Sequence, residues 1–214
     1  MIELEKNRFR NRVPKLLEAL KKRGFDAHFF ETAPEAGEFI VNQISPQETV
    51  GIGGSITIRE NLGIAEALNA KAVTVFDHST AGSAEERIDL KRKQRGVDVF
   101  LTSMNAIDSD GLMVNLDGGG NRVAGTCSGP KRVIAAVSAN KVAESLDSAI
   151  ERTRNHAAVL NSMRLNRKTP CVETGVCSDC SSPERICAAL LILYKKPSDI
   201  DKFTVVLVNE EMGY

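Results

Sequence analysis

The sequence has no surplus of either charge, since its 28 basic residues balance 28 acidic ones over 214 positions. A protein that binds nucleic acid by charge alone needs a basic surplus, so no nucleic-acid partner is expected. The one basic run, KRKQR at 91–95, follows acidic residues by a helical turn. That spacing is typical of a solvated helix face with i,i+4 ion pairs.

Long hydrophobic segments are also missing. The longest apolar run, ICAALLILY at 186–194, is well short of the roughly 20 residues that span a bilayer. The first residues, MIELEKNRFRNR, are charged and lack the apolar core of a secretory signal. We therefore expect no membrane insertion and a cytoplasmic location, where thiols stay reduced.

Internal repeats, low-complexity tracts and Gly/Ser linkers are absent too, which favours one domain over residues 1–214. Helix and strand patterns alternate and predict an α/β fold with a mostly parallel sheet flanked by helices. The predicted helices lie within 7–25, 34–44, 55–70, 84–96 and 144–163. The predicted strands lie within 26–31, 48–54, 72–76, 97–104, 112–117, 131–137, 188–194 and 202–210. The last two are expected to form a terminal strand pair after a Cys-rich appendage.

The segment VGIGGS (50–55) has the pattern of a strand, a glycine turn and a helix start. Glycines let the backbone approach a ligand, and the free N–H groups of a first helical turn favour an anion. Gly53, Gly54 and Ser55 are therefore ligand-binding candidates, and Ser55 is also an N-cap candidate. The pattern is neither G-x-G-x-x-G nor a P-loop, so a tight turn with ordinary capping explains it as well.

The motif DGGGNR (117–122) is more specific. Three consecutive glycines cost backbone entropy and suggest that the chain and a ligand come close. The acidic residue is a candidate for proton transfer, while the amide and the guanidinium can bind a carboxylate or phosphate. The competing interpretation is a flexible surface loop. The residues concerned are Asp117, Gly118, Gly119, Gly120, Asn121 and Arg122.

Further polar residues follow predicted strands. Asn140 and Lys141 come after the strand at 131–137, near the carboxyl edge of the sheet, where α/β proteins bind ligands. A helix start with an exposed lysine is the alternative. Asp108 and Asp110 fit either catalysis or hydrated turn chemistry. The three histidines stand far apart in the sequence, without metal-ligand spacing, and are expected to be structural.

Four of the five cysteines lie in a segment that we call the Cys-rich segment (169–188), with the spacing C-x5-C-x2-C-x6-C. The central C-x2-C pair can grip one metal ion, and the outer thiols can complete four ligands. A metal site with zinc or an iron–sulfur cluster, a redox dithiol and structural thiols are the three interpretations. The candidate ligands are Cys171, Cys177, Cys180 and Cys187. Cys127 is expected to be a small buried residue.

Together these motifs resemble the LUD-domain (lactate-utilisation) family. The similarity runs in family order from about residue 50 to the end of the sequence. The ferredoxin-type repeats of the larger lactate-utilisation subunit are absent, so the chain resembles the short, single-domain branch. The matching segments are VGIGGSITIRE, DVFLTSMNAIDSDGLMVNLDGGGNRVAG, GPKRVIAAVSANKV, AIERTRNHAAVLNSMRL, TPCVETGVCSDCSSPERIC and FTVVLVNEEMGY.

The resemblance implies a fold related to the isomerase and CoA-transferase α/β group, with glycine-rich loops around a small-molecule site. It also implies a link to oxidation of lactate to pyruvate, beside oxidoreductase and iron–sulfur protein subunits. Gly53, Gly54 and Ser55 match the family's first loop, and Glu60 follows in its helix. The family's second loop and third segment are matched by Asp117, Gly120, Asn121, Arg122, Asn140 and Lys141.

Three functions remain open from the sequence. The first is a redox-linked accessory protein that binds a small anionic metabolite or cofactor during oxidation of lactate or a similar 2-hydroxy acid. The second is an isomerase or acyl-transfer enzyme with a structural zinc, acting on a small phosphorylated or acyl substrate. In it Asp117 or Glu60 is the base, and Lys141 and Arg122 hold the anion. The third is a binding module without chemistry. A homo-oligomer is compatible with each.

Overall fold

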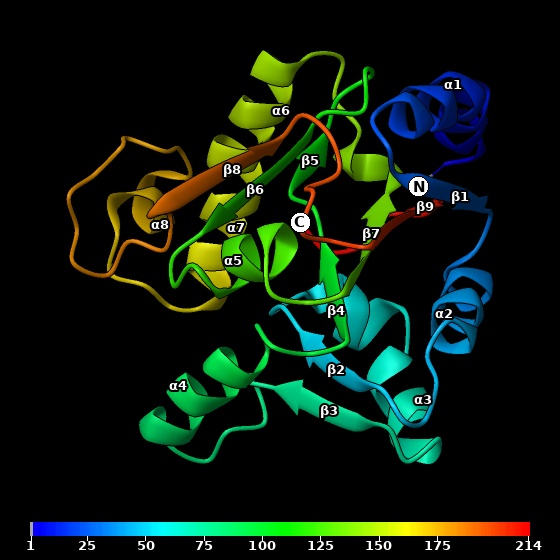
Figure 1. Ribbon diagram of the computed structural model, residues 1–214. Helices are drawn as coiled ribbons and strands as arrows, with labels where there is room; N and C mark the ends of the chain where they lie inside the picture. Colours follow the sequence, from blue (N-terminus) through cyan, green and yellow to red (C-terminus); the bar gives the residue numbers. More distant parts are fainter. Residues whose placement is uncertain (1) are drawn as a thin grey trace.

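The computed structural model describes residues 2–214 and contains two sheets with helices packed around them (Figure 1). The α-helices are α1 (Glu3–Lys22), α2 (Ala33–Asn42), α3 (Ile64–Ala70), α4 (Ala84–Lys93), α5 (Asn121–Cys127), α6 (Leu146–Arg152), α7 (Ala158–Arg164) and α8 (Pro170–Thr174). Three short helical turns of other types are η1 (Thr57–Asn61), η2 (Ala139–Lys141) and η3 (Thr153–Ala157). The strands are β1 (Asp26–Phe30), β2 (Thr49–Ile52), β3 (Thr74–Asp77), β4 (Val99–Ser103), β5 (Ala106–Ile107), β6 (Met113–Asp117), β7 (Arg132–Ser138), β8 (Ala189–Leu193) and β9 (Lys202–Val208).

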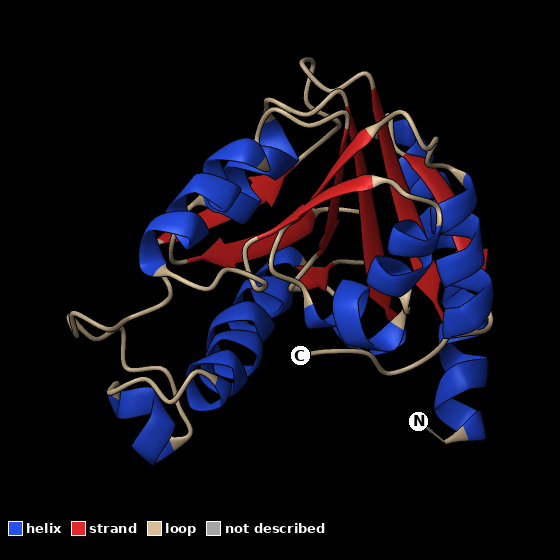
Figure 2. Ribbon diagram, turned by 90° about the horizontal axis from the view of Figure 1, so that it is seen from below, coloured by secondary structure: helices blue, strands red, loops and turns tan. Residues whose placement is uncertain are grey.

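The large sheet has the order β1-β9-β7-β4-β2-β3, and all its paired strands are parallel, which confirms the predicted α/β fold. Successive side chains of a strand point to opposite faces, so each central strand supplies two cores. Val133, Ala135 and Val137 of β7 pack on the side of α1, whereas Ile134 and Ala136 pack on the side of α2 and α3. Figure 2 shows helices on both sides of the sheet.

The strand order places a crevice at the carboxyl ends of β2 and β4. The chain leaves β2 toward β3 at one edge of the sheet, whereas it leaves β4 in the direction of β7. Loops that depart in opposite directions from neighbouring parallel strands leave room for a ligand between them. The Gly53-Gly54 turn follows β2 directly, so the sequence motif lies at this crevice.

The predicted terminal strand pair is wrong. β8 pairs antiparallel with β6 in the small sheet β5-β6-β8, while β9 lies between β1 and β7 in the large sheet. The reason is burial, since β9 is buried at every position after Lys202 and needs a neighbour on each side. β8 is only partly buried and suits the edge of a small sheet.

Several predicted boundaries also change. The helix expected over 55–70 is broken at Gly63, which adopts φ 60 between η1 and α3. The helix expected over 144–163 is one helical run with a π-helical turn, η3, between α6 and α7. The strand expected to be buried at 72–76 is the partly exposed edge strand β3. The helix α5 was not predicted, since no element was assigned to residues 123–127 and a loop was considered over DGGGNR (117–122).

The Cys-rich segment lies at the outer end of the small sheet, with α8 turned away from β1 and α1 (Figure 1). It contacts the body where Gly118 meets the backbone of Ile186. A Cβ atom placed on Gly118 would lie 2.9 Å from the Ile186 carbonyl oxygen. No helix in the described range 2–214 is long and apolar enough to cross a membrane.

Candidate functional site

A cavity of about 510 Å³ opens at the carboxyl edge of the large sheet. Its floor comes from the loops after β2, β3 and β4. The opposite wall comes from the end of β6, the loop before α5, helix α7 and residues 183–186 of the Cys-rich segment. Both glycine motifs line it, so the structure brings together two segments that the sequence separates by more than sixty residues.

The lining of this cavity is strongly basic, although the whole chain has no net charge. The acidic side chains in the lining are Asp117 and Glu184. The basic side chains in the lining are Arg59, Arg87, Lys91, Arg122, Lys141, Arg164, Arg167 and Arg185. Arg59 is paired with Asp77 at 2.8 Å. Such an excess of cations over carboxylates in one concave site favours an anionic ligand.

Arg122 ties the two glycine motifs together. Its Nε donates to the carbonyl oxygen of Gly53 at 3.1 Å and its Nη2 donates to that of Gly54 at 3.0 Å. Both partners are neutral, so the guanidinium keeps its positive charge inside the cavity wall without an ion pair. Burial and the neighbouring cations Arg59 and Arg164 lower the pKa of Arg122, and the Asp117 carboxylate opposes that shift.

Asp117 holds the start of α5. Its Oδ2 accepts from the N–H groups of Arg122 at 2.8 Å and Val123 at 3.3 Å, and its Oδ1 accepts from that of Gly119 at 3.1 Å. A carboxylate at a helix N-terminus satisfies free N–H groups and opposes the helix dipole. The candidate base is therefore engaged with its own loop, which makes Asp117 a residue that shapes the cavity.

The glycines of the two motifs serve different purposes. Position 53 requires glycine because a Cβ atom there would lie 2.6 Å from Cζ of Phe100. Gly119 faces the cavity, where an added Cβ would lie 3.2 Å from Nζ of Lys91. Gly120 has φ 76 with open space around it, so its backbone conformation requires glycine. Of the three consecutive glycines, Gly118 and Gly119 therefore line the cavity, whereas Gly120 lies outside the lining.

Lys141 is buried at the inner end of the cavity, with 3% of its surface exposed, so the alternative of an exposed lysine is wrong. Its Nζ donates to Ser103 Oγ at 2.9 Å and to Thr57 Oγ1 at 3.0 Å. Burial, followed by the nearby cations Arg152 and Arg122, lowers the pKa of Lys141 to about 7. At neutral pH a large fraction of this side chain is a neutral amine, which can accept a proton or bind a carbonyl compound.

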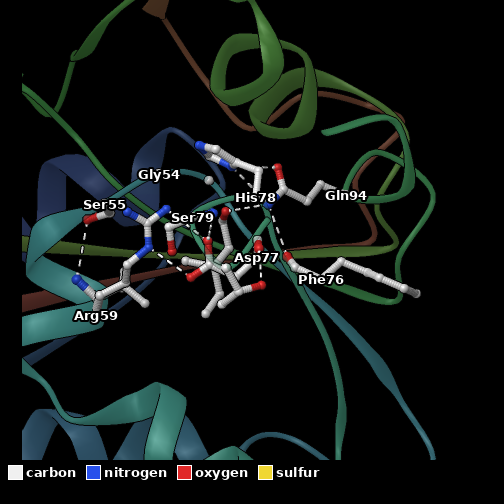
Figure 3. A network of polar contacts seen from close by, with 12 residues as sticks. Gly54, Ser55, Arg59, Phe76, Asp77, His78, Ser79 and Gln94 are labelled. Atoms are coloured by element: carbon white, nitrogen blue, oxygen red, sulfur yellow. Dashed lines mark hydrogen bonds and ion pairs between the residues drawn. The ribbon is translucent and has the colours of Figure 1, made fainter. Parts of the chain in front are cut away.

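A second polar network lies beside the Gly53-Gly54 turn (Figure 3). Arg59 and Asp77 form a two-bonded ion pair, with Nε to Oδ2 at 2.8 Å and Nη2 to Oδ1 at 2.9 Å. His78 follows β3, lines the cavity and contacts the fully buried Gln94. Burial, Arg59 and Lys91 lower the pKa of His78, so its imidazole is neutral at pH 7.

Three other candidate residues are less available to a ligand, because they lie outside the cavity lining or are engaged within the fold. Glu60 is exposed on η1. Asn140 holds the last segment of the chain, since its Oδ1 accepts from the Ser138 hydroxyl at 2.6 Å and the Met212 N–H at 3.4 Å. Ser55 lines the cavity, but its Oγ accepts from the Ile58 N–H at 3.3 Å and caps the following turn.

Asp108 takes part in turn chemistry. Its Oδ1 accepts from the N–H groups of Asp110 at 3.0 Å and Leu112 at 2.8 Å. This arrangement is an Asx turn between β5 and β6, and it accounts for the buried carboxylate without a ligand.

Several residues that line or support the cavity are not among the candidates predicted from the sequence. His78 follows a strand at the same edge as Lys141, so the rule that selected Lys141 also selects His78. Lys91 and Gln94 lie in the basic run that was interpreted as a solvated face. Lys91 instead lines the cavity and Gln94 is fully buried, so that interpretation holds only for neighbours such as Lys93.

The cysteines are five free thiols, all partly buried. Among residues 2–214, no three His, Cys, Asp or Glu side chains lie close enough together to hold a metal ion. Guanidinium groups occupy this region instead. Arg185 donates to the carbonyl oxygen of Cys187 at 3.0 Å, and Arg154 lies 4.0 Å from Cys177 Sγ. This arrangement does not assemble a four-thiolate site, and the metal stays a prediction of the sequence.

These features define an α/β protein with a basic cavity at the carboxyl edge of a parallel sheet. Comparison with known families matches residues 13–208 to the LUD domain, and the chain therefore belongs to the LUD-domain family. A solved DUF162 family protein from Deinococcus radiodurans has a TM-score of 0.53 and 14% identity, covering 94% of this chain and 98% of that one. At this identity the likeness shows the fold alone. No curated protein matches the chain.

Proposed function

We propose that the protein binds a small metabolite that carries more than one anionic group, and that the cavity between the two sheets is its site. The charge of the lining carries this proposal, with eight basic and two acidic side chains. Arg87, Lys91, Arg164 and Arg167 form no ion pair within 4 Å among residues 2–214, so their charge is available to a ligand. Carboxylate and phosphate groups are the anions that arginine and lysine bind best.

Membership of the LUD-domain family suggests the metabolic process in which the protein binds this metabolite. We assign the protein an accessory role in oxidation of lactate or a similar 2-hydroxy acid, in the cytoplasm and beside oxidoreductase or iron–sulfur protein subunits. Free thiols fit a reducing compartment. A 2-hydroxy acid and the 2-oxo acid made from it are both anionic, and a phosphorylated cofactor would add further negative charge.

A second candidate is an isomerase or acyl-transfer enzyme that acts on a small phosphorylated or acyl substrate. Lys141 favours it, since a buried amine with two hydroxyl partners at a cavity wall is suited to acid–base or nucleophilic work. In this case Arg122 and Lys91 hold the anion, and Lys141 exchanges a proton with the substrate. Asp117 positions the loop that carries Arg122.

Titration calorimetry with inorganic phosphate, lactate, pyruvate and 3-phosphoglycerate tests the site. Lys91→Ala should weaken binding of the anions, because Lys91 lines the cavity. Lys93→Ala is the matched control, since Lys93 lies on the same helix, pairs with Asp89 at 2.8 Å and should leave binding unchanged. Equal binding by both variants and the unaltered protein would place the site elsewhere.

A further inference from the structure

The orientation of the Gln94 side chain follows from its surroundings. Nε2 of Gln94 donates to the carbonyl oxygen of Ile52 at 2.7 Å and to that of Phe76 at 3.0 Å. A carbonyl oxygen only accepts, so the reversed amide would set oxygen against oxygen at both contacts. Both hydrogens of the amide nitrogen are used by these bonds. The ends of β2 and β3 therefore lock this buried amide in one orientation.

The locked amide decides which nitrogen of His78 carries the proton. Nδ1 of His78 lies 3.1 Å from Nε2 and 3.3 Å from Oε1 of Gln94, but both hydrogens of Nε2 are used by the two carbonyl oxygens, which leaves Oε1 as the partner of Nδ1. Nδ1 must therefore carry the hydrogen and donate to Oε1. In a neutral imidazole this leaves Nε2 without a hydrogen, as an acceptor.

The imidazole ring of His78 lies beside Gly54, and both residues line the cavity (Figure 3). A Cβ atom placed on Gly54 would lie 3.1 Å from Cε1 and 3.4 Å from Nε2 of His78, so glycine leaves this side of the ring open. Burial, and then the facing cations Arg59 and Lys91, lower the pKa of His78, while the facing Asp77 carboxylate opposes that shift.

The charged side chains of this cavity offer few free acceptors. The guanidinium and ammonium groups that dominate the lining donate hydrogen bonds, and the carboxylate of Asp117 is engaged with three N–H groups of its own loop. Glu184 accepts from the Lys168 N–H at 3.0 Å. A ligand whose polar atoms are all deprotonated oxygens could not donate a hydrogen bond to His78.

We infer that His78 is a specificity-determining residue whose Nε2 accepts a hydrogen bond from a hydroxyl group of the ligand, with Gln94 as its positioning residue. The ligand class is then an anionic metabolite that carries a hydroxyl group, such as a hydroxy acid or a hydroxylated phosphate ester. This inference rests on the proposed anion site and narrows its substrate class.

The first test needs no ligand. Nitrogen-15 NMR of the two ring nitrogens of His78 distinguishes a nitrogen with hydrogen from one without, and His78→Asn assigns the signals. We expect a neutral ring at pH 7 with the hydrogen on Nδ1, and loss of that preference in Gln94→Leu. A hydrogen on Nε2, or a charged ring at pH 7, would overturn the inference.

The second test compares 3-phosphoglycerate with its analogue that lacks the hydroxyl group, 3-phosphooxypropanoate. We expect calorimetry to show roughly fivefold tighter binding of the hydroxylated compound, the size expected for one hydrogen bond. His78→Asn should abolish the difference, because asparagine reaches only the Nδ1 position. His156→Asn, the same change at an exposed histidine outside the cavity lining, should keep it.

The outcomes separate the two claims. Equal binding of both compounds to the unaltered protein overturns the role of His78 and leaves the anion site standing. Failure of both compounds and of inorganic phosphate to bind overturns the anion site and this inference together.

Discussion

Arg122 donates through two nitrogens to Gly53 and Gly54, at 3.1 and 3.0 Å, and so joins a loop of the large sheet to the helix that follows the small sheet. One side chain thereby links the two walls of the cavity. The consequences of this link, and of the groups around it, can be measured.

Replacing Arg122 should affect both stability and binding. Arg122→Ala leaves the carbonyl groups of Gly53 and Gly54 without their donors, which should cost about 2 kcal/mol in the free energy of unfolding. Arg122→Lys keeps the charge but cannot bridge both carbonyls, so it should recover anion binding only in part. Urea denaturation and phosphate titration of the two variants check this. An unchanged free energy in Arg122→Ala would show that the link does not hold the loops.

Lys141 predicts a dependence of stability on pH. Its pKa in the folded protein is about 7, below the ordinary 10.5 of the unfolded chain, so the unfolded chain holds more protons between these values. The cost of burying the charge is complete below pH 7 and disappears toward pH 10.5, and stability should rise by a few kcal/mol in this interval.

Lys141→Met is the matched variant for this measurement, because methionine fills similar space without charge. The rise between pH 7 and 10.5 should be smaller in the variant when unfolding by urea is followed across that range. Parallel curves for the two proteins would mean that Lys141 keeps its charge in the folded state.

Asp117 should matter to the fold more than to proton transfer. Asp117→Ala removes the acceptor of three N–H groups at the start of α5 and should cost about 1–3 kcal/mol in the free energy of unfolding. Glu60→Gln, at the exposed candidate base, should change neither stability nor anion binding. Loss of binding in Glu60→Gln, measured by calorimetry, would restore Glu60 to the site.

The Cys-rich segment gives a prediction about metal content. If the four thiols act together, protein purified without oxygen holds iron with broad visible absorbance, or is colourless with one zinc ion per chain. Metal analysis and an absorption spectrum decide between these results. Metal-free protein, with Cys-to-Ser variants that keep their fold, would contradict a metal site. Contacts such as that of Arg185 with the carbonyl oxygen of Cys187 would then hold this segment in place.

The sequence predicts the parallel sheet because β2, β3 and β4 are short apolar runs separated by helical patterns. The prediction fails where the place of a strand depends on which other strands it pairs with. β8 and β9 have similar composition, but only the sheet shows that one is an edge strand and the other a central strand. Strand pairing depends on contacts between distant segments, which local patterns do not encode.

The candidate site shows the same division. The glycine motifs and Lys141 are recognisable because each of them follows a predicted strand. Lys91 and Gln94 are not, because a basic helix looks solvated until the neighbouring wall is known. His78 could have been predicted as a site residue, since it directly follows β3. An isolated histidine, however, has no spacing pattern that points to a site.

The central claim is that the basic cavity binds an anionic metabolite, and amide chemical shifts measured during a 3-phosphoglycerate titration test it most directly. The account predicts saturable shifts at Gly53–Ser55 and Gly118–Arg122, together with weaker binding in Lys91→Ala. Shifts that are absent from both loops, or that are scattered over exposed lysines of α1 and α4, would contradict it.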